Sequence, residues 1–249
     1  MKYILLLLVS SVVLACSSME KKELSAQEIV DHAIASSGGE LYDKTIIDFD
    51  FRGKHYKSVR NYGQYQYERM FTDTVGIIKD VLNNDGFERF INDTVATMTP
   101  DSMKVKYSAS VNSVLYFALL PYGLNDAAVI KKHLGEVTIK SKEYYKIKVM
   151  FKEEGGGEDH EDVFVYWFDK TNYHMDYMAY SYKTDGGGAR FRSAYNERVV
   201  DGIRLVDYIN YKSKDPTMSI ENFDLAYQDG NLKELSLIEI ENIQVDFNQ

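Results

Sequence analysis

The sequence contains few of the residues that cross-link or interrupt a fold, with one cysteine, three prolines and one tryptophan among 249 residues. A single cysteine excludes an intramolecular disulfide, so packing has to hold the core together. Basic side chains are also the minority, because 38 acidic residues outnumber 29 basic ones and give a net charge of −9. This balance argues against nucleic acid as a partner.

The N-terminus contains a long apolar run that ends close to the lone cysteine. Residues 1–16 read MKYILLLLVSSVVLAC, with one lysine before the run and small residues after it. Because the run is shorter than the about 20 apolar residues that cross a bilayer, it predicts an export signal over residues 1–15. The segment VLAC resembles the lipobox of bacterial lipoproteins, which implies that Cys16 is acylated. An ordinary secretory signal with a coincidental cysteine is the alternative.

Acylation of Cys16 by palmitate-like chains implies anchoring in the outer membrane, because two acyl chains hold a protein stably in a bilayer. We therefore expect a lipidated tether over residues 16–23. The periplasmic face and the cell surface stay open as alternatives for its orientation.

Residues 24–249 read as a single, mainly β domain that opens with a helix. Ser25 and Glu28 form a capping box, an apolar stripe follows, and Gly38 ends the helix. From Lys44 onward apolar residues recur at every second position, which predicts β-strands. Several Asp-Gly dipeptides predict tight hairpin turns between them. The predicted strands are 44–51, 64–72, 76–82, 87–91, 137–140, 144–152, 162–168, 175–183, 190–200, 203–211 and 235–245.

An apolar helical insert interrupts the strands after Pro100. Val111, Val114 and Leu115 lie at helical spacing, and Pro121 ends the pattern. A second short helix is expected over residues 126–134. The insert is more apolar than a surface helix needs, so we expect it to cover the open side of the sheet. Core packing and a movable lid are both compatible with this pattern.

The segments AQEIVDHAIASSGG, SVLYFALLPYGLNDAAV, EDVFVYWFDK and FRSAYNERVVDGIRLVDYINYK are similar to an uncharacterised family of Bacteroidota lipoproteins with a domain of unknown function. The order of the elements resembles the LolA/LolB-type lipoprotein fold. That resemblance implies a curved antiparallel sheet, or incomplete β-barrel, with helices over its concave face. It also implies a non-catalytic protein that binds a hydrophobic, lipid-like molecule.

Two glycine triplets, at residues 155–157 and 186–188, raise the question of a phosphate or metal site. Neither is followed by the Lys-Ser/Thr of a P-loop, and both stand between predicted strands. The acidic residues around His160 do not have the spacing of a calcium-binding loop. We therefore expect solvated hairpin tips, with no metal and no cofactor. The sequence contains no catalytic motif, although residues that converge only in space would escape this test.

Ligand binding is predicted between the sheet and the insert. The strand VFVYWF, residues 163–168, is apolar on both faces, so Trp167 should be buried. The candidate cavity residues are Trp167, Val165, Val163, Tyr145, Ile147, Val149, Phe151, Leu115, Phe117, Leu119 and Leu120. The alternative is a structural or assembly lipoprotein of the outer membrane, whose cavity is filled by its own side chains and whose partner is another envelope protein.

Overall fold

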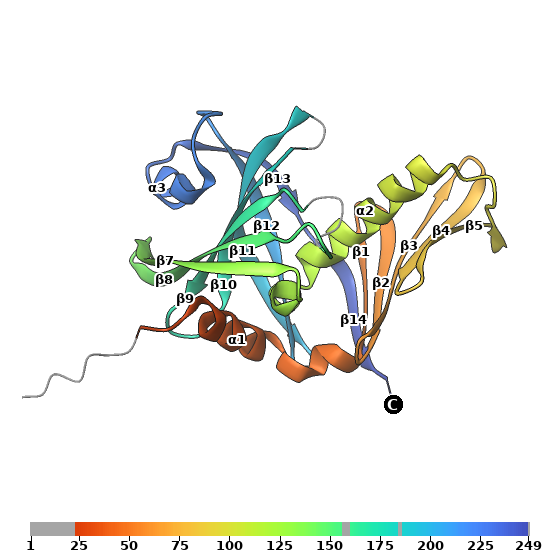
Figure 1. Cartoon of the computed structure of the whole chain (residues 1–249), viewed down its shortest axis with the longest axis horizontal. Coiled ribbons are helices and arrows are strands. Elements are labelled where there is room, and N and C mark those ends of the chain that lie inside the picture. Colours follow the sequence, from red (N-terminus) through yellow and green to blue (C-terminus); the bar gives the residue numbers. More distant parts are fainter. Residues whose placement is uncertain (1–22, 156–159, 184–185, 249) are drawn as a thin grey trace, which may run out of the picture.

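The strands form two seven-stranded antiparallel sheets in the computed structural model, which describes residues 23–155, 160–183 and 186–248 (Figure 1). Sheet A has the order β14-β1-β2-β3-β4-β5-β6, and sheet B has the order β13-β12-β11-β10-β9-β8-β7. Sheet A contains β1 (Thr45–Phe51), β2 (Lys54–Asn61), β3 (Gln64–Asp73), β4 (Gly76–Asn83), β5 (Gly86–Ile91), β6 (Thr94–Val95) and β14 (Glu241–Phe247). Sheet B contains β7 (Val129–Ile139), β8 (Lys142–Phe151), β9 (Val163–Asp169), β10 (Met175–Tyr182), β11 (Gly188–Val200), β12 (Ile203–Ser213) and β13 (Leu232–Ile238).

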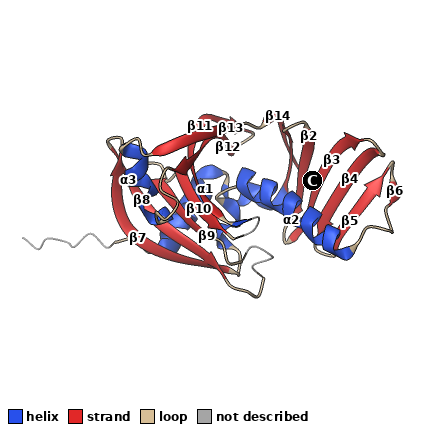
Figure 2. Ribbon diagram, turned by 90° about the horizontal axis from the view of Figure 1, so that it is seen from above, coloured by secondary structure: helices blue, strands red, loops and turns tan. Residues whose placement is uncertain are grey.

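The helices connect and cover these sheets. They are α1 (Ala26–Ser37), η1 (Gly39–Lys44), α2 (Asp101–Ala118), η2 (Tyr122–Asn125), η4 (Ile220–Asn222) and α3 (Phe223–Gln228). Helix α2 lies along β3, β4 and β5 of sheet A and reaches sheet B with its C-terminal end (Figure 2). In the last turn of α2, the hydroxyl of Tyr116 shares a hydrogen bond of 2.9 Å with the hydroxyl of Tyr166 in β9.

The opening helix has the start that its sequence predicts. The backbone N–H of Glu28 donates to the hydroxyl of Ser25 at 3.2 Å, and the carboxylate of Glu28 accepts from the backbone N–H of Ser25 at 2.8 Å. This capping box satisfies two backbone donors that a helix start leaves free. Ile29, Val30 and Ala33 are fully buried against sheet B.

Sheet B is covered on both faces. Phe164, Tyr166 and Phe168 of β9 point towards α1 and the end of α2, on what we call the inner face. The alternate residues Val165 and Trp167 point to the outer face, where they pack with Phe191, Ile220 and Phe223. Because successive side chains of a strand point to opposite faces, the continuous apolar run of β9 packs into two separate core layers, one on each face of sheet B.

The outer face of sheet B carries two lysines of β8, which the η4–α3 segment covers. Lys146 is 9% exposed, and its ammonium lies 2.9 Å from the carboxylate of Asp224 in α3. Lys148 pairs with Glu221 of η4 at 2.7 Å. These ion pairs hold the η4–α3 segment over this face of the sheet.

The predicted fold class is confirmed, since the chain is mainly β with open antiparallel sheets and few helices. Three local predictions were wrong. Strand β2 was not foreseen, residues 129–134 belong to strand β7 and not to a helix, and the single strand predicted over 235–245 is divided between β13 and β14. The last division matters most, because the chain leaves sheet B and enters sheet A at Ile240.

Candidate functional site

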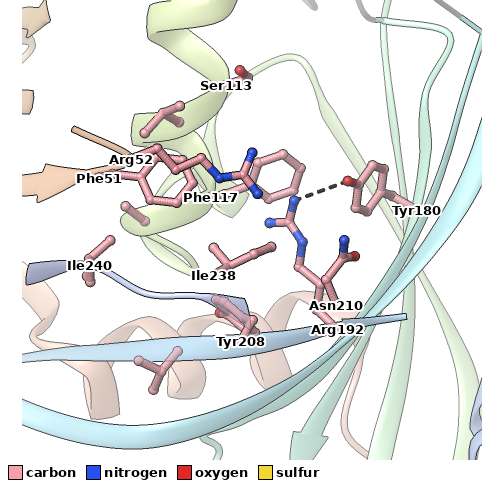
Figure 3. A pocket seen from close by; sticks show the side chains of 13 residues that line it. Phe51, Arg52, Ser113, Phe117, Tyr180, Arg192, Tyr208, Asn210, Ile238 and Ile240 are labelled. Carbon is pink, nitrogen blue, oxygen red and sulfur yellow. Dashed lines mark hydrogen bonds between the residues drawn. The ribbon is translucent and has the colours of Figure 1, made fainter. Parts of the chain in front are cut away.

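A cavity of about 340 Å³ lies between the two sheets beside the C-terminal half of α2 (Figure 3). Its walls come from four places in the sequence: the β1–β2 turn, one face of α2, the inner face of sheet B, and the crossing from β13 to β14. The lining residues are Phe51, Arg52, Ser113, Val114, Phe117, Ala118, Tyr180, Arg192, Val206, Tyr208, Asn210, Ile238 and Ile240. The volume is at the lower end of the range that small-molecule pockets occupy, about 300–1,000 Å³. An apolar ligand of modest size therefore fits the space.

The apolar part of this inter-sheet cavity is made by aliphatic and aromatic side chains from both sheets and α2. Phe117 lies at its centre, with its ring 5.2 Å from that of Tyr180. Val114, Val206 and Ile238 add aliphatic wall. This composition is typical of sites that bury an apolar ligand and orient it with a small number of polar groups.

Two polar side chains on neighbouring strands interrupt the apolar lining. Arg192 of β11 and Asn210 of β12 are directly opposed across the strand pair. Arg192 Nη2 donates to the hydroxyl of Tyr180 at 3.1 Å, whereas its Nε is buried without a hydrogen-bond partner. Asn210 Oδ1 is also buried without a partner. Buried polar atoms are nearly always paired in native proteins, so both atoms are available to a hydrogen-bonding group that enters the cavity, water included.

The phenol of Tyr208 lies beside these groups. Burial raises the pKa of Tyr208 to about 12, against the opposing effect of the positive charges on Arg204 and Arg192. Its hydroxyl is therefore protonated throughout the physiological pH range. It is a neutral neighbour for any group that binds at Arg192.

A second, wider groove of about 910 Å³ lies against the opposite side of α2. Its walls include Leu115, Leu119 and Phe151, but also Arg60 and Asp126. Burial raises the pKa of Asp126, which the positive charges of Arg60 and Lys131 oppose. The charged side chains of this groove are of both signs, whereas those of the inter-sheet cavity are arginines alone.

The residues predicted to line one ligand site fall into four groups in the structure. Phe117 lines the inter-sheet cavity, whereas Leu115, Leu119 and Phe151 line the second groove. Tyr145, Ile147, Val149 and Leu120 belong to the packed core beneath α1. Trp167, Val165 and Val163 lie on the outer face of sheet B. The candidates on β8 and β9 therefore do not line the inter-sheet cavity, whose sheet B wall comes from β10, β11, β12 and β13. Alternation along β9 places Trp167 on the outer face, away from Phe117.

Several residues of the cavity were not predicted. Arg192 and Asn210 stand in strands whose pattern predicts only a half-buried sheet, and Arg52 stands in a turn. Arginine side chains normally face solvent, so the sequence does not indicate a buried Arg192. In the structure Arg192 is paired with Asn210, and both side chains line the cavity.

Cys16 and the acidic residues Glu158 and Asp159 lie outside the described residues. Glu161, on the described side of the same loop, pairs with Lys183 at 2.8 Å. Among the residues that the structure describes, no three His, Cys, Asp or Glu side chains gather where they can hold a metal ion. The helices within the same ranges are all too short or too polar to cross a bilayer.

Comparison with known proteins gives a family and a fold. A family model described as "Family of unknown function (DUF6503)" matches residues 2–240. The LolA superfamily protein NE2245 from Nitrosomonas europaea is similar in structure, with a TM-score of 0.50 at 10% sequence identity, over 91% of this chain and 95% of that one. A DUF1329 family protein from Desulfovibrio piger gives a TM-score of 0.43 at 11% identity, over 89% of this chain and 93% of that one. No curated protein matches in sequence. The likeness to the LolA superfamily protein concerns the fold alone.

Proposed function

This chain belongs to DUF6503, a family of unknown function, and with that as the starting point we propose that it is a non-catalytic binder of an apolar, lipid-like molecule. The observation that carries the proposal is the inter-sheet cavity, with Phe117, Val114 and Ile238 on facing walls. The LolA-like fold supports it, because that fold places two sheets around a space that a helix enters.

The expected affinity follows from the area that such a ligand buries. Removing about 300 Å² of acyl chain from water is worth roughly 7 kcal/mol at about 25 cal/mol per Å², before the costs of association. Micromolar binding requires about 8 kcal/mol net, so burial of the chain alone does not reach it and contacts with the rest of the ligand have to add the remainder. Affinity of this order is suited to a protein that receives a ligand and releases it again.

The first test is extraction of the native protein, purified without detergent, into organic solvent and analysis of the extract by mass spectrometry. We expect a lipid-like molecule in a stoichiometric amount. The second test is titration with dodecanoate, followed by calorimetry. An empty extract together with a flat titration would remove the proposal and favour the alternative, an assembly lipoprotein that binds another envelope protein.

A cavity-filling variant shows whether the ligand occupies the inter-sheet cavity. Val114→Trp places an indole in the space that the ligand needs, so we expect dodecanoate affinity to fall by about tenfold or more. Val199→Trp is the matched control, because Val199 is exposed in β11 and does not line the cavity. Equal losses in both variants, or none in either, would place the ligand elsewhere.

We also propose that the protein is held at the cell envelope through acylated Cys16. The proposal depends on the N-terminal sequence, with its apolar run and lipobox-like VLAC. A soluble ligand-binding domain on a short tether can take up a molecule from the membrane to which it is attached. Orientation towards the periplasm or towards the outside is not specified by this proposal.

A further inference from the structure

The most unusual group in the inter-sheet cavity is the guanidinium of Arg192. The residue is 8% exposed, yet in the described part of the chain no carboxylate forms an ion pair with it. Its contacts are the hydroxyl of Tyr180 and the ring of Phe117, whose centroid lies 4.1 Å from Cζ. A buried cation without an opposite charge is unfavourable, because a neutral hydroxyl and a π face replace its hydration only in part.

A second arginine reaches the same cavity from the opposite sheet. Arg52 stands in the β1–β2 turn, and Figure 3 shows its guanidinium directed towards Phe117 and Arg192. Arg52 has a φ of 49° and the following Gly53 a φ of 70°, as a tight two-residue hairpin turn requires. Asn or Gly suits the first of these positions best, so the turn geometry gives no reason for an arginine there.

Further basic side chains lie on sheet A outside the lining of the cavity. The inner face of sheet A carries Lys54, Arg69 and Arg89, and one buried carboxylate, Asp80, accepts hydrogen bonds from both Arg69 and Arg89. Lys54 lies over the ring of Phe71, and its pKa is lowered by burial and by the charge of Arg69.

We infer that the inter-sheet cavity takes an amphiphile whose head group carries an anionic oxygen, and that Arg192 binds this oxygen. The inference rests on the proposed function, because it assigns the head group of the same ligand. Arg192 Nε, which has no partner within the protein, donates to the anion, and Arg52 approaches from the other wall. The tail lies along Phe117, Val114 and Ile238. Asn210 Oδ1 accepts from a hydroxyl or an amide N–H where the head group has one.

Carboxylate and phosphate both fit this description, since guanidinium groups bind either with charge-assisted hydrogen bonds. The experiment therefore compares three ligands with the same tail: dodecanoate, dodecyl phosphate and dodecanol. For the unaltered protein we expect at least one of the anions to bind about tenfold more tightly than the alcohol. The tighter anion identifies the class of head group.

Arg192→Met removes the charge and keeps an apolar stem of similar reach. We expect its affinity for the preferred anion to fall by about tenfold and its affinity for dodecanol to stay within about twofold. Arg190→Met is the matched control, because Arg190 stands two residues away on the same face of β11 but does not line the cavity. Its affinities for all three ligands should match those of the unaltered protein.

Arg52→Asn provides a variant whose fold is not at risk, because asparagine suits a turn position with positive φ. We expect an unchanged or higher melting temperature together with a severalfold lower affinity for the anion. Equal binding of acids and alcohol, unaffected by Arg192→Met or Arg52→Asn, would overturn the inference and leave the proposed function standing. Failure of all three ligands to bind would instead refute the proposed function.

Discussion

Replacing Asp224 with alanine removes the carboxylate that holds α3 on the outer face of sheet B. Asp224 is 1% exposed, its Oδ2 lies 2.9 Å from the ammonium of Lys146, and it also accepts from the indole N–H of Trp167 at 3.3 Å. The variant leaves a buried ammonium and a buried indole N–H without their acceptor. Breaking a buried ion pair from one side costs about 3–5 kcal/mol, and we expect the lower end because Lys146 keeps slight contact with solvent.

The measurement is urea unfolding followed by the fluorescence of Trp167. Asp224→Ala and Lys146→Met should each lower the free energy of unfolding by about 3 kcal/mol, with an unchanged slope against urea concentration. The double variant Lys146→Met, Asp224→Leu should recover to within about 2 kcal/mol of the unaltered protein, because the uncompensated charge is gone and only the indole N–H of Trp167 is left without its acceptor. Losses below about 1 kcal/mol in the single variants, or additive losses in the double variant, would refute this account of the pair.

Four further outcomes are expected. Asp80→Asn should lower the free energy of unfolding by about 3 kcal/mol in the same urea assay, because two arginine side chains then share a neutral partner in the interior. Hydrogen bonds from Asn242 and His55 lower the pKa of Asp50. The ionised Asp50 therefore stabilises the folded state above the pKa of the unfolded chain, and this stabilisation is lost as the pH falls through the pKa of the folded state. Asn242→Gly should therefore raise the pKa of Asp50 in an NMR titration; an unchanged value would contradict the assignment. Cys16→Ala should leave a soluble or unprocessed product that a palmitate analogue does not label, and labelled, membrane-bound protein would exclude Cys16 as the anchor. Dodecanoate should leave the emission of Trp167 unchanged, since a shift would mean that the ligand perturbs the outer face.

Sequence reasoning succeeded where local chemistry decides the structure. The capping box at Ser25 and the start of α2 after Pro100 depend on neighbouring residues, and both are present as predicted. The hairpin at Asp201-Gly202 likewise follows from positive φ at both positions. Each of these features is determined within a few residues, so the printed sequence contains what is needed.

The predictions from sequence were wrong where contacts between distant parts of the chain determine the structure. In strand β2, Lys54 and Arg60 occupy positions that face inward. The alternation of apolar and polar residues that predicts a strand is therefore absent from this segment. Residues 129–134 have a helix-like composition, yet pairing with β8 makes them a strand. The two-faced apolar run around Trp167 gives no sign of which side holds α2. For the same reason Arg192 was missed, because its inward direction depends on the register of sheet B.

The pairing of β14 with β1 has a consequence for the time course of folding. Thr45 is paired with Phe247, so the neighbour of β1 on one side comes from the far end of the described chain. While the chain is being synthesised, β1 keeps an open hydrogen-bonding edge until the last strand pairs with it. Such long-range pairing is slow to form. We therefore expect newly synthesised chains to depend on protection from association until β14 has formed, and fragments that lack β14 to aggregate through β1.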